Sequence, residues 1–224
     1  APAFSRPQVE AIETIIREYL IRNPETLIEA LDAYEQRRQQ ESGKAVRAAI
    51  AERRAEIFND PAAPISGNPA GDVSIVEFFD YRCPYCKQIV EPMARLLRED
   101  AKIRLVFKEL PILGPDSVIA ARAALAARAQ GKYHQIHQAL MNSRGTLDEP
   151  TVLRIATASG LDAARLKTDM AAPEIERTIE RNRALAVALG ITGTPAFVIG
   201  EQLVPGAIDL ETLKKLVAEA RKGR

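Results

Sequence analysis

The stretch VSIVEFFDYRCPYC, residues 73–86, joins a run of apolar residues to the only two cysteines in the chain. Residues 73–79 are rich in β-branched and aromatic side chains, as expected for a strand that is covered on both faces. Pro84 suits the first position of a helix, where an N–H group would have no intrahelical partner. The stretch therefore predicts a buried strand, a short turn and a helix that begins at the CPYC sequence.

The spacing of the two cysteines, three residues apart, places them on one face of the predicted helix. Cys83 would face the unpaired N–H groups and the positive end of the helix dipole, which favour a thiolate over a thiol. Cys86, one turn further in, is close enough to form a disulfide with Cys83 or to resolve a mixed disulfide. We therefore predict an exposed nucleophile at Cys83 and a more buried resolving thiol at Cys86.

Two structural alternatives remain for these cysteines. One is half of a structural zinc site, but zinc binds about four ligands and the sequence has no second CxxC or paired Cys/His cluster. His134 and His137 are too few to form a metal site, and none is predicted. The other alternative is a pair of buried, inert thiols.

Glu77 interrupts the apolar run within the predicted strand. A carboxylate buried there should have a raised pKa, because burial disfavours the charged form. Such a group could take up and return a proton as Cys86 switches between thiol and thiolate. The alternative is a strand end at which Glu77 meets water.

The order of the remaining elements predicts an α/β fold. Residues 103–110 should form a second strand, and a strand–helix–strand unit of this kind is typical of parallel pairing. Helices are expected over about 115–190. The expected closing elements are a hairpin-like pair of strands and a helix, at residues 196–200, 202–206 and 210–222. Thr194-Pro195 precedes this hairpin, and because only ~5–6% of X-Pro bonds are cis, the residues alone favour a trans bond.

The segment upstream of the strand, residues 1–58, is expected to form an N-terminal helical arm that breaks and restarts at Asn23-Pro24. Apolar residues recur along it at helical spacing, although too irregularly for a coiled coil. Residues 35–44 are polar all round and fit either a solvated helix or a hinge. Because isolated helices are marginal in water, the apolar stripe must be covered by the chain's own domain or by another subunit, and we predict a homo-oligomer.

The composition limits the partners and the location of the protein. A net charge of +1 over 224 residues does not indicate nucleic-acid binding. The apolar runs are shorter than the roughly 18 residues of a membrane span, so no membrane insertion is expected. The chain begins APAF without methionine, and we expect an exported protein whose signal peptide has been removed.

Residues from about 72 to 224 resemble the thioredoxin superfamily, specifically its DsbA-like branch. The resemblance is carried by VEFFDYRCPYC, by GTPAFVIG (193–200) and by the long helical insert between them. It implies a thioredoxin-like catalytic domain at 72–224 with a helical insert at about 115–190, preceded by a linker at 59–71. It also implies a nucleophilic Cys83, a resolving Cys86 and a buried acid at Glu77.

The resemblance further implies a surface for an extended client polypeptide. Pro195 would be cis and lie beside the cysteines, and with Thr194 it would form the wall against which the client pairs like an added strand. Pro84 and Tyr85 would contribute to the same surface. Lys108 is suggested as a charged neighbour of the buried acid.

Residues 4–31 resemble the helical extensions of DsbA-like proteins of the suppressor-of-copper-sensitivity and Com-type groups. In some relatives such an extension makes a trimer that acts as a disulfide isomerase. Strongly oxidising members carry CPHC, so Tyr85 implies a less oxidising pair.

These features together predict a periplasmic thiol–disulfide oxidoreductase, most specifically a trimeric disulfide isomerase. It would act on misfolded client proteins, need no cofactor beyond the Cys83–Cys86 pair and be kept reduced by a membrane-bound thiol reductase. The alternatives are a monomeric dithiol oxidase, or a copper-binding or holdase protein whose two thiolates hold Cu(I).

Overall fold

The computed structural model describes residues 4–223, which form two compact units: one runs through Ala45 and the other starts at Val46. The first unit contains α1 (Arg6–Arg22) and most of α2 (Glu25–Glu52). As predicted, the two helices are interrupted at Asn23-Pro24, where the N–H of Asn23 donates to Tyr19 O at 2.8 Å. Residues 35–44 are helical and almost entirely exposed. Of the two alternatives for this segment, a solvated helix or a hinge, the structure shows the solvated helix.

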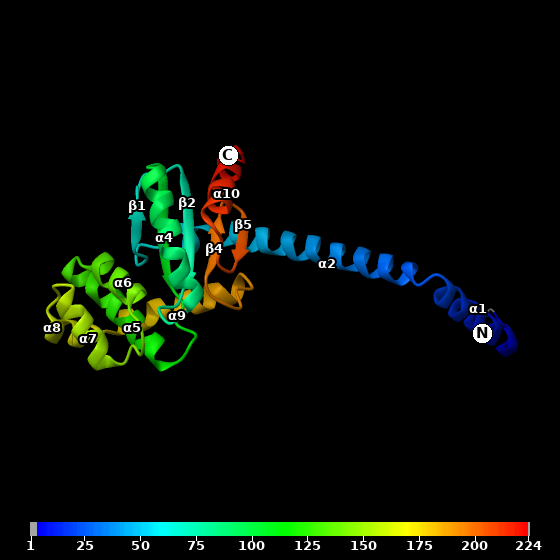
Figure 1. Cartoon of the computed structure of the whole chain (residues 1–224), viewed down its shortest axis with the longest axis horizontal. Helices are drawn as coiled ribbons and strands as arrows, with labels where there is room; N and C mark the ends of the chain where they lie inside the picture. Colours follow the sequence, from blue (N-terminus) through cyan, green and yellow to red (C-terminus); the bar gives the residue numbers. More distant parts are fainter. Residues whose placement is uncertain (1–3, 224) are drawn as a thin grey trace. The chain divides into compact units, whose positions relative to one another are not determined.

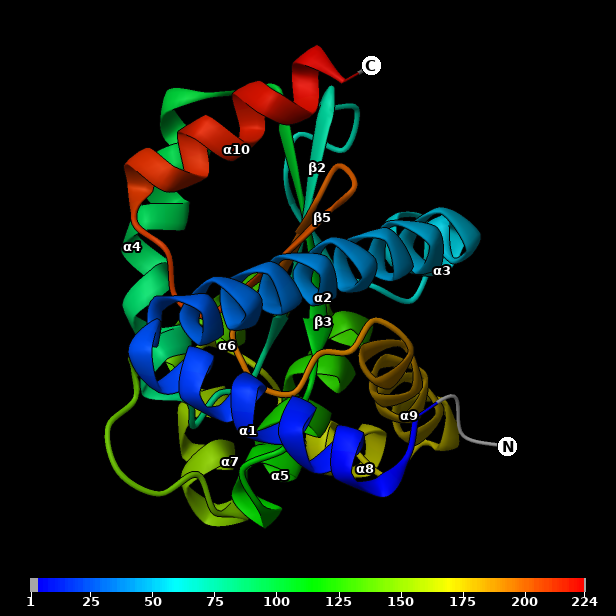
Figure 2. The ribbon, with the colours of Figure 1, turned by 90° about the vertical axis from the view of Figure 1, so that its right-hand side faces the viewer.

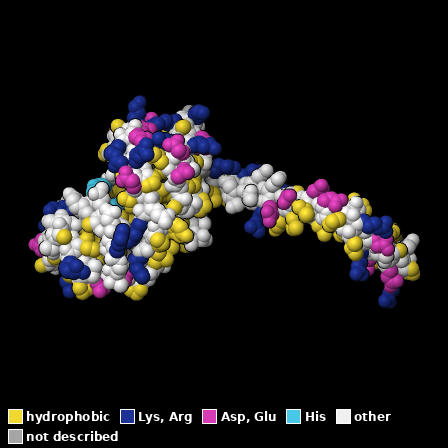
Figure 3. Space-filling model, viewed as in Figure 1, with side chains coloured by type: hydrophobic (Ala, Val, Ile, Leu, Met, Phe, Trp, Pro, Cys, Tyr) yellow, Lys and Arg dark blue, Asp and Glu magenta, His cyan; other side chains and the backbone are white. Residues whose placement is uncertain are grey.

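The apolar side chains of the first unit are mostly exposed, and α1 buries no residue at all. We call these exposed side chains the arm face. They are Phe4, Val9, Ile12, Ile15, Ile16, Tyr19, Ile21, Leu27, Ile28, Leu31 and Tyr34. Figure 3 shows hydrophobic side chains along both helices. Apolar surface of this extent is unusual on a monomer.

The second unit is built on a five-stranded mixed sheet with the order β1-β3-β2-β4-β5. The strands are β1 (Ile65–Gly67), β2 (Val73–Phe79), β3 (Ile103–Glu109), β4 (Ala196–Ile199) and β5 (Gln202–Pro205). β2 and β3 pair in parallel, and the other neighbours are antiparallel. This arrangement confirms the predicted α/β fold.

Each face of the sheet is covered by helices, which explains the unbroken apolar run in β2. On one face, Ile75 and Phe79 pack in one core with residues of α4 (Pro84–Glu99) and α10 (Leu210–Lys222). On the other face, Val76 and Phe78 pack with residues of α3 (Arg54–Phe58) and α9 (Pro173–Ala188). Side chains alternate along a strand, so Glu77 points toward α4.

The helical insert follows β3 and lies beyond one end of the sheet (Figures 1 and 2). It comprises α5 (Pro115–Ala126), the 3-10 helix η1 (Ala127–Gln130), α6 (Tyr133–Asn142), α7 (Glu149–Ala158), α8 (Ala163–Asp169) and the start of α9. Five alanines of α5 are buried, at 120, 121, 123, 124 and 126. Their small side chains let the neighbouring helices pack close to α5.

The second unit begins before the boundary expected at residue 58. Ile50, Ile57 and Phe58 are buried against the α3/α9 face of the sheet, so residues 46–58 belong to this unit and not to a separate arm. A helical pattern in the sequence does not reveal which core the apolar side chains join, and this is why the boundary was misplaced.

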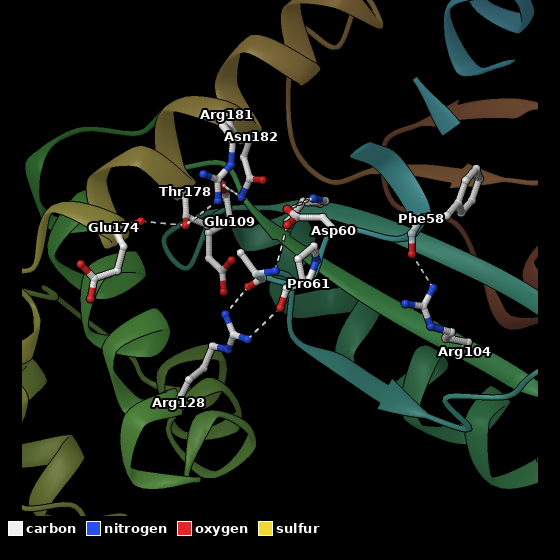
Figure 4. A network of polar contacts seen from close by, with 12 residues as sticks. Phe58, Asp60, Pro61, Arg104, Glu109, Arg128, Glu174, Thr178, Arg181 and Asn182 are labelled. Atoms are coloured by element: carbon white, nitrogen blue, oxygen red, sulfur yellow. Dashed lines mark hydrogen bonds and ion pairs between the residues drawn. The ribbon is translucent and has the colours of Figure 1, made fainter. Parts of the chain in front are cut away.

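The segment expected to be a linker, 59–71, is part of the second unit and is held to it by strand pairing, an ion pair and hydrogen bonds (Figure 4). It contains β1, which pairs with β3. Lys108 forms an ion pair with Asp60, with Nζ and Oδ2 2.6 Å apart. Arg128 donates to the carbonyl oxygens of Pro61 and Ala62. The Pro- and Gly-rich composition correctly indicates turns, but these contacts tie the turns to the sheet and the insert.

Replacing Asp60 with alanine is expected to destabilise the second unit by about 3 kcal/mol, because it leaves the buried Lys108 ammonium without its partner. The Lys108 side chain is only 2% exposed. The free energy of unfolding from denaturant titration measures this loss. Glu56→Ala is the matched control, since Glu56 pairs with Arg53 at the surface and its removal should cost less than about 1 kcal/mol. Equal losses in the two variants would show that the Asp60–Lys108 pair contributes no more than a surface pair.

Candidate active site

The cysteine turn forms where β2 ends and α4 begins. Cys83 is the residue before the first helical position and Pro84 occupies that position, as the sequence predicts. The N–H of Cys83 donates to Asp80 O at 3.1 Å, and the N–H of Lys87 donates to Cys83 O at 3.2 Å. Both cysteines are free thiols in this structure. The turn therefore presents Cys83 at the helix start, with Cys86 one turn deeper.

Cys83 lies against the loop that leads into β4. The bond between Thr194 and Pro195 is cis, as the family resemblance implies and against the trans bond favoured by the residues alone. Cys83 Sγ donates to Thr194 O at 3.2 Å. Because this loop covers it, Cys83 is only 4% exposed, and the expectation of an exposed thiol is wrong in this structure. Pro84 and Tyr85 are exposed beside it, Tyr85 by 59%.

Cys86 is completely buried in the core between the sheet and α4. Burial raises the pKa of the Cys86 thiol far above its ordinary value, and the charges of Cys83 and Glu77 raise it further. Hydrogen bonding to the main chain of Asp80 and to the Thr194 side chain opposes this only in part. Cys86 is therefore a protonated thiol unless a nearby group takes its proton.

Glu77 is the buried acid that the sequence predicts, and the alternative of a solvated strand end is wrong. It is 4% exposed and lies between Phe107 of β3 and Phe197 of β4. Burial raises the pKa of Glu77 to about 8. The carboxyl lines a cavity of about 80 Å³ that it shares with Ile89 of α4. Glu77 can thus exist in both protonation states near neutral pH.

Lys108 does not accompany this acid. Phe107 of β3 is the residue paired with Glu77. Because side chains alternate along a strand, the next residue, Lys108, projects from the opposite face of the sheet. There it forms an ion pair with Asp60. The suggestion that Lys108 is a charged neighbour of Glu77 is wrong.

A buried aromatic cluster forms the floor of the site. The Tyr81 hydroxyl lies 3.0 Å from His137 Nδ1, and the rings of Phe79, Tyr81, Phe107 and Tyr133 surround this histidine. Burial lowers the pKa of His137 to about 3, so the ring is neutral and packed. Within residues 4–223, no group of three His, Cys, Asp or Glu side chains is placed to hold a metal ion.

Sequence analysis missed one polar residue of the site, Asp80. It is 1% exposed, and its carboxylate accepts hydrogen bonds from the N–H of Arg82 and from the loop that follows β3. An aspartate between a strand and a cysteine turn is typical of turns in general, and the sequence carried no signal of the distant partners. Of the helices described here, none is both long and apolar enough to cross a membrane.

Comparison with known proteins extends these local observations to the whole chain. Residues 74–218 match the DSBA-like thioredoxin domain, and residues 8–41 match the N-terminal domain of copper resistance protein ScsC. The chain spans about a quarter of the length of the Na⁺/H⁺ antiporter NhaA proteins of Salinispora that it also matches.

Three solved structures show how far the similarity reaches. A thioredoxin-like oxidoreductase from Silicibacter pomeroyi DSS-3 is 51% identical, with a TM-score of 0.74, over 75% of this chain and 98% of that one. A periplasmic thioredoxin-like protein from Salmonella enterica serovar Typhimurium is 32% identical, with a TM-score of 0.67, over 75% and 94%. Proteus mirabilis ScsC in a transitional conformation is 28% identical, with a TM-score of 0.74, over 99% and 100%. The chain therefore belongs to the DsbA-like thioredoxin-domain family and carries an ScsC-type N-terminal domain ahead of that fold.

Proposed function

We propose that the chain is a thiol–disulfide oxidoreductase that acts on exported proteins as a disulfide isomerase. The observation that carries the proposal is the placing of the two thiols, with Cys83 at the start of α4 against the cis-proline loop and Cys86 fully buried behind it. This arrangement separates an attacking sulfur from a resolving one.

The first step is attack of the Cys83 thiolate on one sulfur of a client disulfide. The client S–S bond breaks, its other sulfur leaves as a thiolate, and Cys83 becomes joined to the client in a mixed disulfide. If a second client thiolate then attacks the client sulfur of this mixed disulfide, a new client disulfide forms and Cys83 is released. The client has then exchanged one pairing for another with no net oxidation or reduction.

The alternative second step uses Cys86. Its thiolate attacks Cys83 Sγ, the Cys83–Cys86 disulfide forms, and the client leaves with both sulfurs reduced. Cys86 must first lose its proton, and the ionised Glu77 carboxyl on the same side of the sheet is the group we assign to accept it. The pKa of Glu77, raised by burial to about 8, lets it accept a proton and later release it near neutral pH.

Thr194 and Pro195 form the assigned client-binding wall, together with the exposed Pro84 and Tyr85. The Thr194 carbonyl lies 3.2 Å from Cys83 Sγ, so a client strand paired with this loop would bring its sulfur to Cys83. Tyr85 supplies no cation to stabilise a thiolate, which favours a less oxidising pair and therefore isomerisation.

A reduced Cys83 is required for the first attack, so we assign a membrane-bound thiol reductase as redox partner and the periplasm as location. The similarity to a periplasmic thioredoxin-like protein supports the location. A DsbA-like dithiol oxidase is the second candidate, supported by the family itself. The match to a copper resistance protein's domain supports a third, in which Cys83 and Cys86 hold Cu(I) as soft ligands.

The deciding experiment gives the reduced chain to ribonuclease A with scrambled disulfides and follows the return of nuclease activity. An isomerase restores activity in its reduced form. An oxidase instead generates activity from fully reduced ribonuclease A, and only when its own cysteines are oxidised. Stoichiometric Cu(I) binding with neither activity would replace the proposal by the copper-binding function.

The arm face is assigned to homo-oligomerisation, with a trimer as the expected assembly. Ile16→Lys and Leu27→Lys together are expected to convert the oligomer to a monomer, because two charges would have to be buried in an apolar contact. Light scattering on the full chain measures the molar mass. Glu29→Lys, on the exposed surface of the same helix α2, is the control and should leave the mass unchanged. A monomeric wild-type chain would contradict the assignment.

A further inference from the structure

Asp80 holds together three segments that meet at the cysteine turn. Its Oδ1 accepts from the N–H of Arg82 at 2.7 Å and from the Ser117 hydroxyl at 2.8 Å. Its Oδ2 accepts from the N–H groups of Ile112 and Leu113, at 2.8 and 3.0 Å. These are four hydrogen bonds to a side chain that is 1% exposed, and each partner is a neutral donor.

The Asp80 carboxylate accepts hydrogen bonds from main-chain N–H groups that lie beyond the end of the β2–β3 pairing. The last ladder bond runs from the N–H of Leu110 to Phe79 O at 2.8 Å, after which the two strands separate. In the loop that follows, Pro111 has no N–H, and the N–H groups of Ile112 and Leu113 point to the Asp80 carboxylate. Asp80 accepts from both of them and also binds Ser117 in the first turn of α5.

A second contact fixes the same loop from the cysteine turn. Arg82 Nη1 donates to Leu113 O at 2.9 Å, so both main-chain polar groups of Leu113 are bound by residues 80–82. Gly114 then turns the chain into α5 with φ 106°, a conformation that favours glycine. These hydrogen bonds therefore fix the position of the loop main chain relative to the turn that carries Cys83.

The side chains of this loop are free although its main chain is bound. Ile112 and Leu113 are 44% and 43% exposed, and Tyr85 is 59% exposed. Among residues 46–223, these three and Val187 are the exposed large apolar side chains. Three of the four thus stand on the cysteine helix or on the loop bound to its turn, where a client's apolar residues would arrive with its disulfide.

We propose that Asp80 is a positioning residue that holds Ile112 and Leu113 beside Cys83 as contacts for the client polypeptide. The inference rests on the proposed exchange activity and adds a requirement to it. The rate of exchange with a polypeptide substrate should depend on the position of this loop. The rate with a small disulfide, which contacts only Cys83, should not. The cysteine chemistry itself does not pass through Asp80.

The test compares two substrates of the reduced full-length chain, scrambled ribonuclease A and hydroxyethyl disulfide, each as a second-order rate constant for exchange. Asp80→Asn keeps the size of the side chain but places an amide group among the four donors. It is expected to slow exchange with ribonuclease A by about tenfold or more, because small misplacements of binding groups are costly. Exchange with hydroxyethyl disulfide should stay within about twofold.

Three further variants separate positioning from loss of stability. Leu113→Ser should reproduce the selective loss without touching the carboxylate. Adding it to Asp80→Asn should give less than the product of the two single losses, since both act on one contact. Asp60→Asn, which changes the carboxylate that pairs with Lys108, is the matched control and should change both rates equally or not at all.

The proposal is overturned if Asp80→Asn lowers both rates by the same factor, or if either Asp80→Asn or Leu113→Ser leaves the rate with ribonuclease A unchanged. If Asp80→Asn does not fold, Leu113→Ser and Ser117→Ala decide the matter by the same ratio of rates. A wild-type chain that exchanges with neither substrate contradicts the proposed function itself, so the two failures are distinguishable.

Discussion

Replacing Cys83 with serine is expected to lower the rate of disulfide exchange by at least about 10³-fold. A serine hydroxyl is far less acidic than a thiol and does not form the mixed disulfide. Cys86, the other cysteine of the chain, cannot take over, because it is completely buried and burial raises its pKa. The measurement is the recovery of activity by scrambled ribonuclease A.

Cys86→Ser is the matched control for this result, since it makes the same chemical change one helical turn away. It leaves the first attack and the client-resolved second step intact, so isomerisation should persist at a measurable rate. Disulfide exchange by the Cys83→Ser chain at a rate near that of the wild type would contradict the assignment of Cys83 as the nucleophile.

Replacing Glu77 with glutamine is expected to stabilise the chain by about 3 kcal/mol at pH 7. Burial raises the pKa of Glu77 from an ordinary value of 4.5 to about 8. Between these two values the folded state holds a proton that the unfolded state has released. The stability contributed by protonated Glu77 is therefore fully present below pH 4.5 and falls as the pH rises through this window.

Denaturant unfolding between pH 5 and 8 measures the effect. The wild type should lose stability with rising pH, and Glu77→Gln should lose less, because glutamine does not titrate. Glu201→Gln, at an exposed position, is the control and should lie within about 0.5 kcal/mol of the wild type. Parallel pH profiles for the wild type and Glu77→Gln would contradict a buried, titrating carboxyl.

The same variant separates the chemical role of Glu77 from its effect on stability. If the carboxylate accepts the Cys86 proton, Glu77→Gln should slow formation of the Cys83–Cys86 disulfide by about 10²-fold or more. The first attack by Cys83 should keep its rate. An unchanged resolving step would leave Glu77 as a structural residue only.

Much of the fold and part of the site follow from local sequence patterns. The apolar run at 73–79 predicts a strand covered on both faces, and Pro84 predicts the helix start beside Cys83. Glu77 is recognisable as a buried acid because it stands within that run. Each of these inferences needs only residues that are close in the sequence.

The features that sequence analysis missed depend on distant segments meeting. Cys83 is buried and donates a hydrogen bond to Thr194 O, 111 residues away, and no local pattern indicates that contact. Asp80 bonds to Ile112 across 32 residues, and Asp60 pairs with Lys108 across 48. The boundary at residue 58 failed for the same reason, since Ile57 and Phe58 join a core made by the sheet and α9.

The central claim is that Cys83 attacks a client disulfide, and the most direct test is to trap the covalent product. In Cys86→Ser the only thiol left is Cys83. After incubation with scrambled ribonuclease A and quenching with an alkylating reagent, intact-mass spectrometry should detect a one-to-one adduct that a reductant splits. A Cys86→Ser chain whose Cys83 is recovered entirely as the alkylated free thiol, with no adduct, would contradict the claim.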